Sequence, residues 1–193
     1  MSELAVALIH HPVLDREGGV VTTAMTNLDL HDMARSARTF GATALYIVHP
    51  IEAQRELASR IVSHWVEGSG RRRIPDRAVA LEIVRIVRNL DEAIEDLGRR
   101  SVERDAGQVE LWTTAARAQG EITEWTPARR RLEETRSPVL LVFGTGWGLT
   151  PELLARANVR LAPIEGTEAD AYNHLSVRAA CAITLDRLRG RPG

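Results

Sequence analysis

Residues 140–149, LLVFGTGWGL, decide how this chain folds. An apolar run breaks into glycines at alternate positions and then restarts as TPELL at residues 150–154. This order predicts a buried strand, a tight loop, and a helix that is capped by Thr150 and has Pro151 at its first position. A loop of glycines carries few side chains, so its backbone groups can approach a ligand closely.

A second informative stretch is YNHLSVR at residues 172–178, which places polar residues at the start of another predicted helix. The first N–H groups of a helix have no partner within the helix, and they form a ready polar site. Together, the two stretches predict a small-molecule pocket that is built mostly from backbone atoms.

Apolar runs of strand length alternate with helical patterns along the whole chain. The predicted strands span residues 4–9, 44–48, 81–87, 108–113, 139–143 and 159–164. The predicted helices span residues 30–39, 53–66, 91–99, 127–134, 151–157 and 176–188. This alternation predicts an α/β fold with a mostly parallel sheet and helices on both faces, in a single domain over residues 1–193. Ligands of such sheets bind beyond the carboxyl ends of the strands.

Composition narrows the class of protein and its partners. The formal net charge is −1, so the chain has no overall positive field that would attract nucleic acid. Every basic residue other than histidine is an arginine. Contacts to RNA would come from local arginine runs, at residues 71–73 and 129–131. The single cysteine, Cys181, lies in an apolar run and is predicted to be buried. The chain start lacks signal-peptide features and no segment reaches membrane-spanning length, which predicts a cytoplasmic protein.

Three separated segments combine with this pattern: the predicted capped helix TNLDLHDMARSARTFGA at residues 26–42, the glycine loop at 144–149, and the helix start at 173–178. In this order they resemble the three motifs of the SPOUT family of RNA methyltransferases, most of all the branch that methylates the ribose 2′-hydroxyl of tRNA and rRNA. They are also similar to the predicted RNA methyltransferase domain that is sometimes joined to bacterial tRNA guanine-N1 methyltransferases.

The resemblance implies a SPOUT fold, in which the C-terminal segment forms a deep trefoil knot. It also implies S-adenosyl-L-methionine (SAM) as the cofactor, RNA (a tRNA first of all) as the substrate, and a homodimer. The cofactor-binding positions that it implies are Thr113, Thr114, Ala115, Gly144, Thr145, Gly146, Gly148, Leu149, Ile164 and Leu175. The catalytic positions that it implies are Arg35, Asp29, Asn27, Asn173 and Ser176.

The sequence departs from the family pattern at each motif. Thr145 stands between the first two glycines, where the family usually carries a glutamate. His174 occupies the usual asparagine position of the third motif, and Asn173 precedes it. Asp29 occupies the usual asparagine position of the first motif, with Asn27 two residues earlier. The acceptor atom therefore stays open between a ribose 2′-hydroxyl and a base nitrogen.

Methyl transfer is an in-line displacement, so the protein has to position the nucleophile and remove its proton. Arg35 is always protonated, and we expect it to bind phosphate and orient the reacting group rather than to act as a base. Asp29, His31, Asp32 and His174 are the alternative proton acceptors.

Other functions fit the sequence less well. The glycine loop lacks the Lys-Ser/Thr ending of a P-loop, and the histidines lack clear metal-ligand spacing, so no metal site is predicted. The alternative function is a dimeric SPOUT-like module that binds RNA or cofactor without catalysis. The dimer that the resemblance implies is predicted to include the helices at 30–39 and 176–188 in its interface. Both helices carry broad apolar stripes, and the alternative is that these stripes pack on the sheet of their own chain. Trp65 and Trp125 are expected either to stack on RNA bases or to pack in the core. Residues 68–73 are expected to form a mobile loop.

Overall fold

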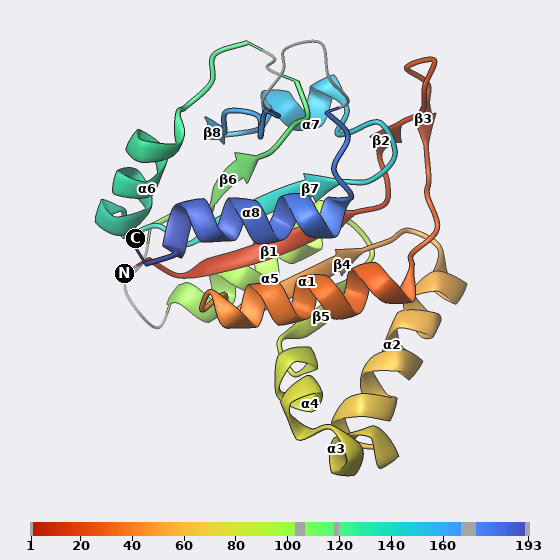
Figure 1. Cartoon of the computed structure of the whole chain (residues 1–193). Helices are drawn as coiled ribbons and strands as arrows, with labels where there is room; N and C mark the ends of the chain where they lie inside the picture. The colour runs from red at the N-terminus through yellow and green to blue at the C-terminus, as the bar shows by residue number, and fades with distance from the viewer. Residues whose placement is uncertain (1, 103–106, 118–119, 167–172, 192–193) are drawn as a thin grey trace.

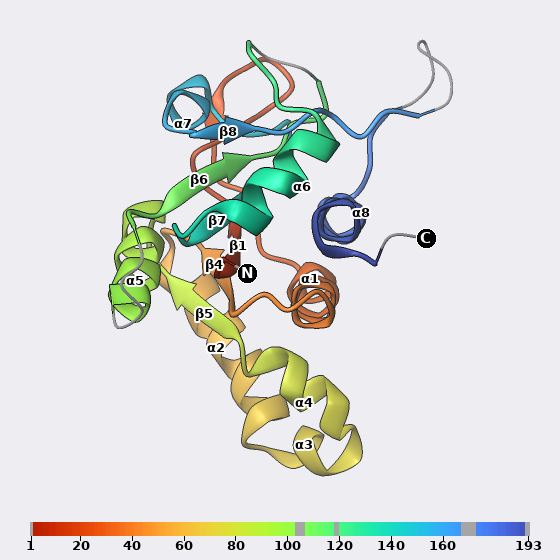
Figure 2. The same cartoon turned by 90° about the vertical axis from the view of Figure 1, so that its left-hand side faces the viewer.

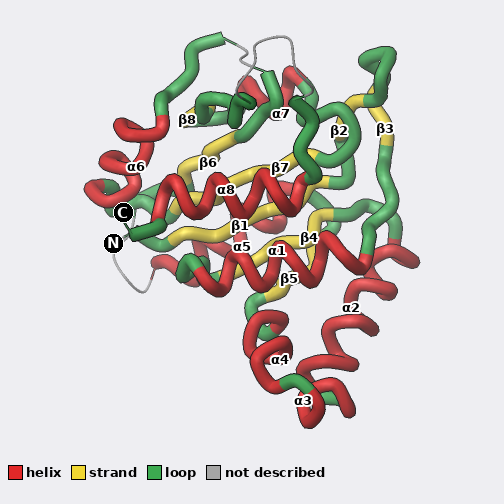
Figure 3. The backbone as a smooth tube through the Cα atoms, in the orientation of Figure 1, coloured by secondary structure: helices red, strands yellow, loops and turns green. Residues whose placement is uncertain are grey.

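A computed structural model describes residues 2–102, 107–117, 120–166 and 173–191. At its centre lies a six-stranded sheet with the order β5-β4-β1-β7-β6-β8 (Figures 1 and 3). All neighbouring strands in it are parallel. The strands are β1 (Leu4–Ile9), β4 (Ala44–Val48), β5 (Val84–Val87), β6 (Glu110–Thr113), β7 (Val139–Gly144) and β8 (Val159–Arg160). The predicted α/β class is therefore confirmed.

Helices cover both faces of the sheet (Figure 2). On one face lie α1 (Asn27–Thr39), α6 (Trp125–Glu134) and α8 (Val177–Arg189), and on the other lie α5 (Leu90–Val102) and α7 (Pro151–Ala155). The central strands β1 and β7 are buried on both sides, which explains their continuous apolar sequences. Alternate residues of β1 enter two separate apolar clusters, one under each helical layer.

The apolar stripes of α1 and α8 pack inside the chain's own core. Leu30, Met33 and Ala37 of α1, and Cys181 and Leu185 of α8, all belong to the cluster beneath these helices. Cys181 is fully buried, as predicted, and burial raises the pKa of its thiol to about 12. These stripes therefore do not by themselves indicate a dimer.

An arm of three helices, α2 (Glu52–Val66), α3 (Ser69–Arg73) and α4 (Pro75–Leu81), extends below the sheet in Figure 1. Trp65 lies at its centre: the Arg77 guanidinium is 4.5 Å from the ring centroid. Gly70 packs so closely that an added Cβ would lie 2.6 Å from Trp65 Cε3. These tertiary contacts explain why residues 69–73 are helical, so the predicted mobile loop at 68–73 is wrong.

Several predicted strands need correction. The strand predicted at 108–113 begins at Glu110, and the one predicted at 159–164 ends at Arg160, because β8 pairs with the last two residues of β6, Trp112 and Thr113. The strand predicted at 81–87 begins only at Val84, because Leu81 is the last residue of α4, and Pro75 starts that helix at its first position. The sequence analysis also missed a short antiparallel hairpin, β2 (Val13–Leu14) and β3 (Val20–Val21). Two-residue strands are too short to show a period in the sequence.

The predicted cap at the start of α7 and the predicted capped start of α1 are confirmed, whereas the cap of α8 was not predicted. The hydroxyl oxygens of Thr26, Thr150 and Ser176 accept from backbone N–H groups in the first turn of the helix that each one precedes. No described helix is long and apolar enough to cross a membrane. The expected trefoil knot of the C-terminal segment stays a prediction, because residues 167–172, just before this segment, lie outside the described residues.

Candidate active site

The glycine loop begins where β7 ends, beside the end of β1 at the carboxyl edge of the sheet. Thr145 N donates to the Ile9 carbonyl at 3.2 Å, and Gly148 N donates back to the Thr145 carbonyl at 3.1 Å. Gly146 and Gly148 have positive φ angles, +60° and +109°, which side chains disfavour. The loop is therefore a tight turn that requires glycine.

The glycines also allow backbone to approach backbone. A Cβ added at Gly144 would lie 2.9 Å from Leu149 N, and one at Gly146 would lie 2.7 Å from the Leu14 carbonyl oxygen. By contrast, a Cβ at Gly148 would meet no atom within 4 Å. One side of the loop is thus tightly packed, while the surface at Gly148 is open.

The β2–β3 hairpin supports the packed side of this loop. Trp147 N donates to the Leu14 carbonyl and Leu14 N donates to the Gly148 carbonyl, both at 2.9 Å. A bridge between Val13 and Leu149 continues the pairing. The hairpin that supports the loop was not predicted. Its signal in the sequence was the pair Gly18-Gly19 between two short apolar pairs, VL at 13–14 and VV at 20–21.

A chain of hydrogen bonds beneath the loop has a defined direction. Thr145 Oγ1 donates to the Ile9 carbonyl at 3.0 Å, so it accepts from Thr23 Oγ1, which lies 2.5 Å away. Thr23 Oγ1 in turn accepts from His10 Nδ1 at 3.1 Å. The hydroxyl of Thr145, an expected cofactor-binding residue, is therefore engaged within the protein.

Two buried histidines, His10 and His49, lie at the far end of these hydrogen bonds from the glycine loop. His10 and His49 have ring centroids 5.1 Å apart. His49 Nδ1 accepts from Ile51 N at 3.2 Å, so its Nε2 donates to the Thr23 carbonyl at 3.0 Å. Burial, with the neighbouring His49 charge, lowers the pKa of His10 to about 4, and burial also lowers the pKa of His49. Both rings are neutral near pH 7, and His10 Nε2 has no hydrogen-bond partner in the described part of the chain.

The third-motif segment lies against the other two loops. Asn173 Nδ2 donates to the Ala116 carbonyl, just beyond β6, at 3.3 Å. The ring of His174 lies edge-on to Trp147 of the glycine loop, with centroids 5.7 Å apart. At the end of β6, the buried Thr113 hydroxyl has no partner among the described residues. The structure therefore brings together the strand end at 113–116, the glycine loop and the segment at 173–175.

The first-motif helix joins this site through ion pairs with α8. Asp29 Oδ1 lies 3.1 Å from Arg178 Nη1, and Asp29 Oδ2 accepts from Thr26 Oγ1 at 2.6 Å. Arg178 Nε also lies 3.5 Å from Asp32 Oδ2. Asp29 is thus a buried carboxylate with both oxygens engaged, which makes it a positioning group rather than a free base. Arg178 is a residue that the sequence analysis missed.

The other expected catalytic residues lie differently. Arg35 is exposed, forms no hydrogen bond or ion pair with a described residue, and is about 9 Å along the helix axis from Asp29. Asn27 is exposed at the start of α1, and the Ser176 hydroxyl oxygen caps α8. Burial lowers the pKa of His31, and the charges of Arg77 and Arg35 lower it further. Among the described residues of one chain, Arg35 therefore forms no hydrogen bond or ion pair with the three loops.

The remaining expected cofactor positions line the same edge at its surface. Thr114 is bonded to the Val142 carbonyl by both its N–H and its hydroxyl, at 3.3 Å each. Ala115 and Ile164 are partly buried, and Leu175 is exposed. Within the described ranges, no group of three or more histidine, cysteine or acidic side chains is arranged to hold a metal ion.

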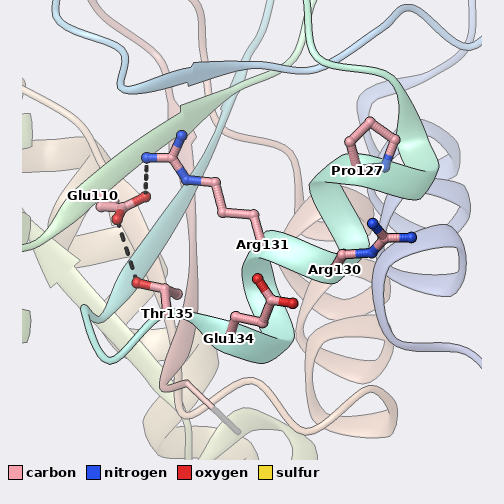
Figure 4. A pocket seen from close by; sticks show the side chains of 6 residues that line it. All are labelled: Glu110, Pro127, Arg130, Arg131, Glu134 and Thr135. Carbon is pink, nitrogen blue, oxygen red and sulfur yellow. Dashed lines mark hydrogen bonds and ion pairs between the residues drawn. The ribbon is translucent and has the colours of Figure 1, made fainter.

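A groove lies elsewhere, at the amino end of β6. This groove of about 350 Å³ is lined by Glu110, Pro127, Arg130, Arg131, Glu134 and Thr135 (Figure 4). Arg131 Nη2 donates to Glu110 Oε2 at 2.9 Å, and Thr135 Oγ1 donates to Glu110 Oε1 at 3.4 Å. The groove is shallow, and none of the three motifs contributes to its lining, so it is not the candidate active site.

The arginine runs are only partly available for RNA. Arg129 donates to the Gly190 carbonyl and Arg131 pairs with Glu110, which leaves Arg130 exposed without an ion pair in the described part of the chain. Arg71 pairs with Glu82 at 3.3 Å, whereas Arg72 and Arg73 are exposed at the end of the arm. Trp65 and Trp125 are partly buried against the core, each with an arginine over its ring.

Comparisons of sequence place the chain among known proteins. The model of a family described as SAM-dependent RNA methyltransferase matches residues 3–190. A tRNA (guanine-N(1)-)-methyltransferase of Oleidesulfovibrio alaskensis is 44% identical over 184 residues, which are 95% of this chain and 41% of that protein. An uncharacterized protein of Aquifex aeolicus is 39% identical, over 96% of this chain and 88% of its own length. This chain therefore spans less than half the length of the first of these relatives.

Solved structures share the fold at low sequence identity. A probable methyltransferase of Bordetella pertussis superposes with a TM-score of 0.61 at 18% identity, covering 97% of this chain and 95% of that one. The SpoU methyltransferase AviRb of Streptomyces viridochromogenes, solved in complex with SAM, gives a TM-score of 0.57 at 14% identity, covering 97% of this chain and 57% of its own.

Proposed function

The chain belongs to the family of SAM-dependent RNA methyltransferases, and from this premise we propose that it transfers a methyl group from SAM to a tRNA. The observation that carries the proposal is the meeting of the strand end at 113–116, the glycine loop and the segment at 173–175 on one edge of the sheet. The tRNA class rests on the names of two relatives that this chain matches over part of their length. The acceptor is a ribose 2′-hydroxyl or a base nitrogen.

The residues at this edge fit the cofactor. Backbone groups of residues 144–149, the open surface at Gly148 and the unpartnered Thr113 hydroxyl are neutral and polar, as an adenosine requires. The partly buried Ile164 adds apolar surface nearby, whereas Leu149 is buried in the core beneath the loop. When bound, SAM supplies a methyl group on a cationic sulfonium. The packed side of the loop, held by Leu14 and Thr23, keeps the open side in a fixed shape.

The chain's own residues would then bind and orient the RNA. Arg35 binds a phosphate and places the acceptor atom for in-line attack. Asp29, held by two donors, keeps the start of α1 in place. Asp32 and His174 are the exposed or half-exposed groups near this edge that can take the proton from the nucleophile.

A homodimer forms part of the proposal. Arg35 is exposed and forms no hydrogen bond or ion pair with the described residues of the three loops, so a two-fold axis beside α1 and α8 would let it serve the partner's site. Leu28, 61% exposed at the start of α1, adds apolar surface there. The proposed place of action is the cytoplasm, where tRNA is available. Light scattering should report twice the chain mass of 21.4 kDa, and an active monomer would refute the shared site.

The direct test is incubation of the purified chain with labelled SAM and total bacterial RNA, followed by mapping of the labelled nucleotide. Label in tRNA that depends on Arg35 is the expected result. The second candidate function, a binding module without catalysis, is favoured by Thr145, whose hydroxyl faces inward where the family usually carries a glutamate. That alternative predicts cofactor binding by calorimetry and no label in any RNA.

A further inference from the structure

Arg178 is the polar link between the helices of the first and third motifs. Its Nη1 lies 3.1 Å from Asp29 Oδ1, and its Nε lies 3.5 Å from Asp32 Oδ2. Positions three apart on a helix share a face, so both carboxylates of α1 point toward α8. We call Asp29, Asp32 and Arg178 the latch.

The Asp29–Arg178 ion pair is needed for stability because Asp29 is buried. The Asp29 side chain is only 11% exposed, whereas Arg178 and Asp32 are 37% and 44% exposed. A buried carboxylate needs a paired charge, and Arg178 supplies it. A guanidinium has separate donors in one plane, so it can hold two carboxylates at once, which a lysine ammonium does less well.

The latch lies where a small shift would change the site. Arg178 follows the α8 cap by two residues, and the segment just before that cap contacts the loops after β6 and β7. At the other end, Asp32 precedes Arg35 by one turn of α1. The relative position of α1 and α8 therefore sets the position of Arg35 against the three loops.

We propose that Arg178 is a positioning residue for methyl transfer, which acts by holding Asp29 and Asp32 so that α1 keeps its place beside the third motif. This inference rests on the proposed function. It assigns Arg178 no contact with cofactor or RNA.

The test compares steady-state kinetics of Arg178→Ala with those of the parent chain. We expect kcat to fall about ten- to a hundredfold, the size typical of a misplaced reacting group, with little change in KM for SAM or RNA. Arg178→Lys should recover part of kcat. Arg88→Ala is the matched control, because it removes an arginine that pairs with Glu92 at 2.8 Å, away from the three loops, and should leave kcat unchanged.

A double variant separates positioning from stability. Arg178→Ala leaves Asp29 buried without its cation, whereas Asp29→Asn with Arg178→Ala removes both charges. The expected result is a melting temperature near that of the parent, with kcat still low. Recovery of the parent kcat would overturn the proposal, because the pair would then only neutralise a buried charge. A higher KM for RNA at unchanged kcat would also overturn it, in favour of a phosphate contact.

Hydrogen exchange distinguishes failure of the latch from failure of the proposed function, because it needs no methyl transfer. In Arg178→Ala, amides of α1 should exchange faster than in the parent or in Arg88→Ala. A parent chain that methylates no RNA contradicts the proposed function, and the exchange result still decides on the latch. If Arg178→Ala changes neither amide exchange in α1 nor kcat, the positioning role of Arg178 is refuted and the proposed function still stands.

Discussion

The carboxyl edge of the sheet presents backbone, whereas the groove between α6 and β6 presents charged side chains. At the carboxyl edge, a turn with two positive-φ glycines meets the ends of two strands and the start of α8. In the groove, Glu110, Arg131 and Thr135 bond to one another within a hollow (Figure 4).

This difference explains why the groove is not the candidate active site. Side chains that satisfy one another have little left to offer a ligand, and a pair at an exposed rim is worth little energy. The carboxyl edge instead offers the open surface at Gly148 and the buried Thr113 hydroxyl, which has no hydrogen-bond partner among the described residues. Matched substitutions in the two regions test the comparison.

The largest effect is expected from Gly146→Val. A side chain there has a strained positive φ and its Cβ would lie 2.7 Å from the Leu14 carbonyl oxygen, so the loop must shift. We expect a loss of SAM affinity of about a hundredfold, measured by calorimetry. Gly41→Val is the control, because Gly41 has a φ of +73° but its added Cβ would meet only Arg189 Nη1, at 3.8 Å. Full affinity in a folded Gly146→Val chain would remove the loop from the site.

Arg35→Ala should come next, and Arg130→Ala in the groove is its match, since both arginines are exposed. Loss of a phosphate-holding arginine is expected to lower methyl transfer about a hundredfold. Cofactor affinity and melting temperature should stay at parent values. Equal rates for Arg35→Ala and Arg130→Ala would show that Arg35 is only a surface charge.

The buried histidines beneath the loop predict a pH effect on stability. Burial lowers the pKa of His10 from 6.5 to about 4, so the unfolded chain binds a proton in this range that the folded chain does not. Stability should therefore fall as the pH drops from about 6.5 towards 4, by up to about 1.4 kcal/mol per pH unit for this group. His49, whose pKa is also lowered, adds to the slope. Denaturant melts at several pH values should show that the free energy of unfolding depends less on pH in His10→Gln than in the parent. The exposed control His64→Gln should keep the pH dependence of the parent.

The smallest effect is expected from Thr23→Val, which removes the donor to Thr145 Oγ1. We expect about 1 kcal/mol less stability and a measurable loss of SAM affinity, because the glycine loop loses support. Thr135→Val removes a hydroxyl bonded to Glu110 in the groove and should leave SAM affinity unchanged. If both variants bind SAM equally, the hydrogen-bond chain under the loop does not contribute to its shape.

Much of the fold was predictable because the main strands are buried on both faces. Continuous apolar runs marked β1 and β4 at their observed limits, and capping residues marked the starts of α1 and α7. The α3 helix was not predictable from its Gly- and Arg-rich sequence, since packing of Gly70 on Trp65 stabilises it. The β2–β3 hairpin likewise depends on pairing with a loop more than a hundred residues later.

For the site, the sequence predicted which segments meet but not how their side chains point. The inward turn of Thr145 depends on Thr23, and the engagement of Asp29 depends on Arg178, 149 residues later. Such contacts leave no periodic signal. The role of Arg35 stays a prediction.

The most direct test of the central claim is a crystal structure with S-adenosylhomocysteine, the demethylated cofactor. The account predicts that it lies at the carboxyl edge, with polar contacts to the backbone of residues 144–149 and to the strand end at Thr113. Binding in the groove beside Glu110 and Arg131, with the glycine loop empty, would contradict it.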